Sequence, residues 1–228
     1  MINFLKRAYC LAAVVLAAAF VAACGGGGSS DPAVVPPAPV LAQYQGTWAQ
    51  VCQRETTVNN IVVGSSRATV VVGSPSATGS ISVVSFDQYF NSADCTGLAV
   101  ATITDTPGIS SPAGTRTVGL VTAVKIDTTV AAGTSTFSGP AASLGVCGGD
   151  QFPSIKVVLG TGANATTRCK SVTSTAATFK GLLSFVSTLV TPNTFDLGDN
   201  GTGLNETIDS QGYPTVFFPA TLGRYTKQ

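Results

Sequence analysis

Histidine is absent from the 228-residue chain. Without an imidazole, the chain cannot use Ser-His-Asp or Cys-His activation of a nucleophile, and it lacks the general base that is commonest near neutral pH. The Ser-Lys alternative lacks its Ser-x-x-Lys motif, and no glycine-rich phosphate loop precedes a helix pattern. We therefore expect a protein that is not an enzyme, with no catalytic residue and no cofactor.

Charged side chains are scarce, at 10% of the chain against about 25% in an ordinary globular domain. Twelve basic residues stand against eleven acidic ones, so no basic surface attracts the chain to nucleic acid. We expect no nucleic-acid partner. Thr, Val, Ser, Gly and Ala take the place of charged residues, and Val and Thr favour the pleated surface of a sheet.

Amphipathic helix patterns are missing too, because apolar residues do not recur at intervals of 3.6 over ten or more residues. Short apolar stretches alternate instead with turn signals such as Gly73-Ser74-Pro75 and Asn200-Gly201. This pattern predicts an all-β domain, either an antiparallel β-barrel or a β-sandwich. The expected strands are residues 47–54, 67–72, 80–90, 97–104, 115–127, 155–159, 178–190, 194–197, 204–208, 215–218 and 222–225. Residues 107–114 and 140–150 are expected to be loops, and 155–159 to be a central strand.

The first 23 residues have the organisation of a secretory signal peptide. Lys6 and Arg7 provide a basic start, and an apolar run of about 13 residues extends from Ala8 to Phe20. That run is too short to cross a bilayer, which requires about 20 residues. Cleavage after Ala23 would leave Cys24 as the first residue, with ten basic and eleven acidic residues in the mature chain.

Val21-Ala22-Ala23-Cys24 resembles the lipobox of bacterial lipoproteins. The resemblance implies that the Cys24 thiol carries a diacylglycerol and that its new amine is acylated. Gly25 follows the cysteine where Asp would favour the inner membrane, so the resemblance implies the outer membrane, facing the periplasm or the cell surface. We expect a protein of the bacterial cell envelope that contacts the membrane through this lipid anchor. The alternatives are an ordinary signal peptide with an unmodified cysteine and a short buried helix.

The remainder of the chain divides into a linker and a domain. Residues 24–42 contain the lipidated Cys24 followed by Gly-, Ser- and Pro-rich sequence, which is typical of an extended tether. Residues 43–228 are long enough to form a single β domain with a substantial core.

Cysteine usage agrees with export. Cys10 leaves with the signal peptide and Cys24 is consumed by the lipid, so an even number remains for an oxidising compartment. The remaining cysteines are Cys52, Cys95, Cys147 and Cys169. Three pairings are open, and we favour Cys52–Cys95 with Cys147–Cys169 because each pair staples neighbouring strands. A metal site is disfavoured, since there is no histidine and no C-x-x-C pair.

Gly46-Thr47-Trp48 resembles the opening motif of lipocalins and related calycin barrels. The resemblance implies a lipocalin-like barrel in which a basic residue near the C-terminus packs over the tryptophan, and we assign that part to Arg224, through a cation–π contact of about 0.5–2 kcal/mol. The family's later Thr-Asp turn motif and its final helix are not found in the sequence. Gly46-Thr47-Trp48 with Cys52, and Tyr89 with Cys95, also resemble small lipoprotein β domains of Gram-negative bacteria, a resemblance that implies no activity.

Acidic residues gather near the C-terminus, at Asp196, Asp199, Glu206 and Asp209. With Asn200 they could form a Ca²⁺ loop, but the spacing misses the Asp-x-Asp-x-Asp-Gly pattern. We interpret them as turn residues, because Asp, Asn and Gly are what tight turns require. A carboxylate pair of the glycosidase kind is a further alternative.

Three functions follow from these observations. The first is a non-catalytic β domain, anchored to the membrane, that binds a small apolar ligand, a lipid or a glycan. The second is a structural lipoprotein that binds another envelope protein and has no small-molecule ligand. The third is a hydrolase that uses the C-terminal carboxylates. We favour the first two over the third, and the sequence assigns no ligand-binding residue.

Overall fold

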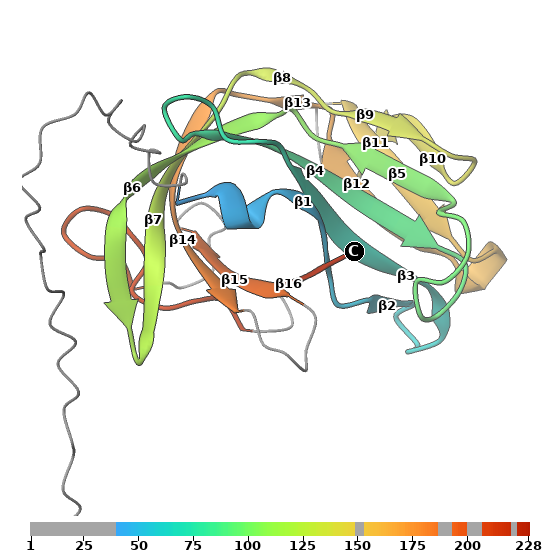
Figure 1. The fold of residues 1–228 in the computed structure, drawn as a ribbon. Helices are drawn as coiled ribbons and strands as arrows, with labels where there is room; N and C mark the ends of the chain where they lie inside the picture. Colours follow the sequence, from blue (N-terminus) through green and yellow to red (C-terminus); the bar gives the residue numbers. More distant parts are fainter. Residues whose placement is uncertain (1–39, 149–152, 187–192, 200–206, 220–222) are drawn as a thin grey trace, which may run out of the picture. The chain divides into compact units, whose positions relative to one another are not determined.

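The computed structural model describes residues 40–148, 153–186, 193–199, 207–219 and 223–228 (Figure 1). The expected signal peptide, Cys24, most of the linker and Glu206 lie outside these residues. The described residues fall within the unit Ala38–Gln228.

Strands account for almost all of the described secondary structure. The elements are η1 (Ala42–Tyr44), β1 (Gly46–Gln50), β2 (Gln53–Thr56), β3 (Val62–Val72), β4 (Ile81–Phe90), β5 (Ala101–Thr104), β6 (Gly108–Val118), β7 (Val121–Val130), β8 (Gly133–Thr134), β9 (Thr136–Ser138), β10 (Ala142–Val146), β11 (Pro153–Leu159), η2 (Gly162–Asn164), β12 (Thr166–Ser171), β13 (Thr173–Ser174), β14 (Ala177–Val186), β15 (Thr194–Asp199) and β16 (Arg224–Lys227). Both η1 and η2 are single 3₁₀ turns. In the part of the chain that the structure describes, no helix has the length and apolar character needed to span a membrane.

Eight of the strands close into an antiparallel barrel. Each barrel strand pairs with the next one along the chain, in the order β1-β3-β4-β6-β7-β14-β15-β16, and β16 pairs back with β1. At this closure Trp48 lies opposite Lys227. Figure 1 shows these strands as a ring around η1. The all-β prediction is therefore confirmed, and of the two architectures left open, the structure has the barrel.

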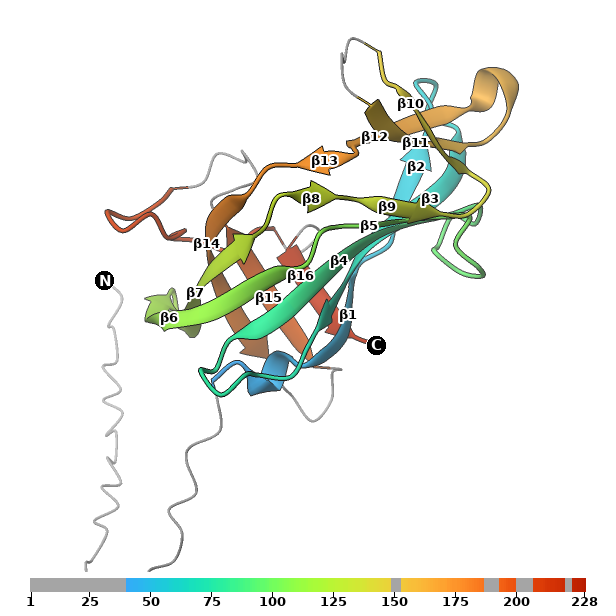
Figure 2. The same cartoon turned by 90° about the horizontal axis from the view of Figure 1, so that it is seen from above.

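Strands β3 and β4 continue past the barrel. With β2, β5, β9 and the sheet β10-β11-β12, their extensions form what we call the second layered region. β3 pairs with β1 only through Thr69–Val72, and its earlier residues pair with β2. β4 likewise changes neighbour from β6 to β5, and β9 pairs with β5. A separate three-stranded sheet, β10-β11-β12, gathers beside this extension (Figure 2). β11 is central in that sheet, as predicted for residues 155–159.

The molecule therefore has two apolar cores. The barrel core includes Trp48, Ile81 and Leu183, and the second core is formed by Ala101, Ile103, Ile155, Val157 and Leu159. Every second side chain of a strand points to the same face of the sheet. On β4, the inward residues of the first half face the barrel core, and those of the second half face the second core. Tyr89, two residues after Asp87 on that face, packs against the second core.

Both expected disulfides are confirmed. Cys52, between β1 and β2, is bonded to Cys95 in the loop after β4. Cys147, directly after β10, is bonded to Cys169 in β12. Each bond joins segments of the second layered region.

Some element predictions are wrong. Residues 115–127, expected as one strand, form the end of β6, a turn and most of β7, because Gly119 adopts a φ of 60° and Leu120 is fully exposed at the turn. Residues 107–114, expected as a loop, lie mostly in β6, whose register with β7 shifts between Pro112 and Thr115. Residues 140–150 contain β10.

Candidate functional site

One end of the barrel is closed by aromatic residues. Tyr44 and Trp48 are at most 1% exposed, and the Trp48 Nε1–H donates a 2.6 Å hydrogen bond to the Tyr44 carbonyl. Phe195 packs edge-on against both rings, with centroid distances of 5.7 Å to Tyr44 and 5.0 Å to Trp48, and stacks on Tyr225 at 4.9 Å. The 3₁₀ turn η1 therefore acts as a plug held by edge-to-face aromatic contacts, each stabilising by about 0.5–1.5 kcal/mol beyond burial.

A cavity of about 520 Å³ fills the barrel beyond this plug. Most of its wall area is apolar, with aliphatic side chains such as Val70, Ile81 and Leu183 and aromatic ones at the plug, but small polar residues such as Ser85 and Ser110 also line it. The volume lies within the range of about 300–1,000 Å³ that is typical of small-molecule sites. An apolar space of this size is suited to the body of an apolar ligand.

The cavity exists because many inward positions carry small side chains. Along β4 the inward residues change from Ile81 and Val83 to Ser85, and on the neighbouring β6 they are Gly108 and Ser110. An eight-stranded barrel is only just wide enough for its side chains to fill it. Small residues at these places therefore leave space that larger ones would occupy.

The opposite end of the cavity is polar and reached by solvent. The Lys170 ammonium lies 2.6 Å from an Asp87 carboxylate oxygen and 2.7 Å from one of Asp105, and the Ser135 hydroxyl donates to Asp105 at 3.2 Å. The Lys170 and Asp105 side chains are 31% and 29% exposed. We call Asp87, Asp105, Ser135 and Lys170 the polar rim. Asp105, Ser135 and Lys170 line the cavity together with Thr173 and Ser174 of β13, and Asp87 belongs to the rim through its contact with Lys170.

Electrostatics keep the rim lysine charged. Burial alone would lower the pKa of the Lys170 ammonium, but the Asp87 and Asp105 carboxylates outweigh burial and raise that pKa above its ordinary value. The rim therefore holds a charged Lys170 ammonium bonded to two carboxylate groups.

A second ion pair lies next to the rim. Glu55 is 4% exposed; its carboxylate bonds Arg168 at 2.6 Å and accepts a hydrogen bond from the Ser66 hydroxyl at 2.6 Å. Burial, followed by the nearby carboxylates of Asp87 and Glu55, raises the pKa of the Tyr89 phenol to about 12. The rim and this pair form a charged layer between the two apolar cores.

The expected contact between Arg224 and Trp48 is wrong. Lys227 takes that place, with its ammonium 5.4 Å from the centre of the Trp48 ring. The reason is strand alternation, since Lys227 lies directly opposite Trp48 while Arg224 faces away from the barrel. Arg224 instead forms a two-point ion pair with Asp196 of β15, at 2.7 and 2.8 Å.

The C-terminal acidic residues do not converge on one site in the described structure. Asp196 lies inside a strand, so its interpretation as a turn residue is wrong. Asp199 ends the same strand, β15. Asp209 does shape a turn, because its carboxylate accepts the backbone N–H groups of Gln211 and Tyr213 at 2.9 and 3.0 Å. The described residues contain no group of three or more His, Cys, Asp or Glu side chains able to hold a metal ion.

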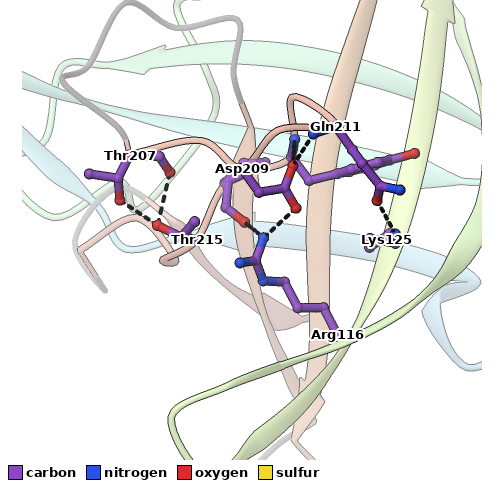
Figure 3. Close-up of polar contacts among 8 residues, drawn as sticks. Arg116, Lys125, Thr207, Asp209, Gln211 and Thr215 are labelled. Atoms are coloured by element: carbon purple, nitrogen blue, oxygen red, sulfur yellow. Dashed lines mark hydrogen bonds and ion pairs between the residues drawn. The ribbon is translucent and has the colours of Figure 1, made fainter.

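Side chains of β6 and β7 bind this turn through hydrogen bonds and an ion pair (Figure 3). The Arg116 guanidinium of β6 bonds the Asp209 carboxylate at 2.8 Å and the Pro214 carbonyl at 3.1 Å. Burial alone would raise the pKa of Asp209. The Tyr213 and Gln211 N–H groups and the Arg116 charge outweigh burial and hold that pKa below its usual range. Tyr213 donates to Asp127 at 2.8 Å and lies under the ammonium of Lys125 at 4.6 Å. These contacts are structural and lie apart from the cavity lining.

The rim residues were missed by the sequence-based reasoning. One signal was available in β4, where Ile81, Val83 and Ser85 alternate towards the interior and Asp87 occupies the next inward position. A charged residue at an inward position requires a partner. That partner, Lys170, comes from a strand 83 residues further along the chain, which no local pattern could indicate.

The fold and the site together define a structural class, an up-and-down antiparallel barrel with one aromatic end, one polar end and an internal cavity. Comparisons with models of protein families, with curated proteins and with solved structures find no match to this chain. The functional argument therefore depends on the chemistry of the cavity and its rim.

Proposed function

We propose that this chain is a lipid-anchored protein of the bacterial cell envelope whose barrel binds a small apolar ligand without catalysis. The observation that carries the proposal is the cavity of about 520 Å³, whose wall is largely apolar. Burying apolar surface contributes about 0.8 kcal/mol per methylene group, so such a wall favours any ligand with a hydrocarbon body. The polar rim would face the ligand's hydrophilic end.

The lipocalin-like resemblance belongs to the same proposal. Its support is the position of Gly46-Thr47-Trp48 beside the η1 plug, together with a basic residue, Lys227, over the tryptophan ring. The order of the barrel strands along the chain also agrees with it. Members of such a class hold apolar molecules inside the barrel, which is the role we propose here.

The anchor is proposed from the Val21-Ala22-Ala23-Cys24 motif and Gly25. Two or three acyl chains on one cysteine would hold the protein stably at the outer membrane, because a single chain binds only marginally. Replacing Cys24 by Ala should therefore move the protein from the detergent phase to the aqueous phase in a phase-separation assay, or leave the signal peptide uncleaved. If the signal peptide has been removed from the variant and its partitioning into detergent is still unchanged, the anchor is contradicted and the cavity proposal is left untouched.

A chain-length series tests the cavity. The full chain with Cys24→Ala, purified without detergent, is titrated with 1-octanol, 1-decanol and 1-dodecanol by calorimetry. We expect one alcohol bound per chain and an affinity that rises about fourfold for each added methylene, from 0.8 kcal/mol each. Absence of binding, or an affinity indifferent to chain length, would overturn the proposal and favour a lipoprotein that binds another envelope protein.

A further inference from the structure

We propose that the ligand's polar end is a protonated amine, so that the cavity selects apolar amines over fatty acids of the same length. This inference rests on the proposed function, because it assumes that the cavity is occupied by an apolar body. It names the chemical class of ligand from the charges that surround the open end.

The charges around the open end come from four parts of the fold. Asp87 lies on β4 and Asp105 follows β5, while Lys170 reaches over from β12 on the facing sheet. Glu55 of β2 and Arg168 of β12 form the adjoining pair. Three carboxylates thus face two cations. The charges of Glu55 and Arg168 cancel. The remaining two carboxylates and Lys170 give the described groups at this end a net charge of about −1 at neutral pH.

Lys170 does not offer a counter-ion to an anionic ligand. Its ammonium is already shared by two carboxylates at 2.6 and 2.7 Å. Turning it towards a third carboxylate would leave Asp87 or Asp105 without its cation, in a place that is only about one third exposed. A fatty-acid head group would therefore meet like charge at the rim.

A protonated amine meets the opposite situation. Ionised carboxylates only accept hydrogen bonds, and an ammonium group only donates them. An ammonium placed at the rim would neutralise the excess negative charge without displacing Lys170. The hydroxyls of Ser135 and Thr173 nearby are neutral and can accept or donate, so they do not discriminate between head groups by charge.

The test holds the hydrocarbon constant and changes only the head group. Dodecylamine, 1-dodecanol and dodecanoate are titrated into the Cys24→Ala full chain at pH 7 and 0.15 M salt, below the concentrations at which they form micelles. We expect the amine to bind about tenfold or more tighter than the carboxylate, with the alcohol between them, and the ratio to shrink as salt is raised. If the alcohol binds, and dodecanoate binds as tightly as dodecylamine or more tightly, this inference is overturned and the proposed function stands. Binding of none of the three would overturn the proposed function and this inference with it.

Two matched variants place the effect at the rim. Asp105→Asn keeps the shape of the side chain and takes the net charge at the open end to about zero, so the amine-to-carboxylate ratio should fall at least about threefold. Asp94→Asn removes the same charge from the exposed loop after β4, outside the cavity lining, and should leave the ratio unchanged. An unaltered ratio in Asp105→Asn, or an equal fall in Asp94→Asn, would contradict a rim that reads the head group.

Discussion

Glu55 and Asp196 are two carboxylates, each bonded to an arginine, whose surroundings differ. Glu55 is 4% exposed and also holds Ser66, whereas the Asp196–Arg224 pair lies on the outer surface with Arg224 46% exposed. We expect Glu55→Ala to lower the free energy of unfolding by about 2 kcal/mol, somewhat less than for a fully buried pair because Arg168 is 52% exposed and can be rehydrated. Asp196→Ala should cost at most about 1 kcal/mol. Urea unfolding of both variants checks this difference, and a larger loss in Asp196→Ala would contradict it.

Tyr89 makes a residue-scale prediction about alkaline pH. Burial and three nearby carboxylates raise the pKa of its phenol from 10.0 to about 12 in the folded protein. The unfolded chain therefore loses this proton first, so the stabilisation is complete below pH 10 and is lost as pH rises through about 12. Tyr89→Phe should lose less stability than the unmodified protein between pH 9 and pH 11.5, as measured by denaturant unfolding at each pH. Parallel losses would show that Tyr89 does not titrate in this way.

Single residues were predictable from the sequence where the chemistry was local. The four cysteines could be paired because neighbouring strands bring successive cysteines together, and both pairs are found. Choosing Arg224 over Lys227 as the partner of Trp48 failed because the choice depends on strand register, and a shift of one residue exchanges the two faces. Pattern alone did not specify which face of β16 is inward.

At the scale of elements, the disulfides tie the second layered region to itself. The bonds close loops of 43 and 22 residues. By loop-closure entropy, replacing Cys52 and Cys95 together with Ser should cost about 4 kcal/mol, and replacing Cys147 and Cys169 about 3 kcal/mol. Thermal unfolding of the two double variants measures these costs. A smaller loss from the Cys52 and Cys95 variant than from the other would contradict the ordering by loop length.

Strands were predictable where apolar and polar residues alternate regularly, and they were missed where this alternation is interrupted. The strands at β4, β11 and β14 overlap their predicted ranges closely. The hairpin of β6 and β7 was read as one strand because Gly119 and Leu120 interrupt a continuous β-branched pattern by only two residues. β12 was not anticipated, because its inward residues Arg168 and Lys170 are charged rather than apolar.

At the scale of the whole molecule, the all-β class follows from composition and periodicity, but closure does not. The barrel closes when β16, at the end of the chain, pairs with β1 near its start, a contact between segments almost the full domain apart. The cavity is a step further removed, because its volume depends on side chains from strands on all sides. Sequence patterns specify which residues face inward and leave open how well those residues fill the interior.

The affinity for 1-dodecanol of two matched tryptophan variants tests the cavity most directly. Val83→Trp places an indole in the cavity, while Val71→Trp places the same side chain on the outer face of the adjacent strand, where Val71 is 38% exposed. We predict that Val83→Trp weakens binding at least about tenfold, the equivalent of two buried methylenes, and that Val71→Trp binds as tightly as the unmodified barrel. Equal affinity in both variants would contradict a ligand inside the barrel.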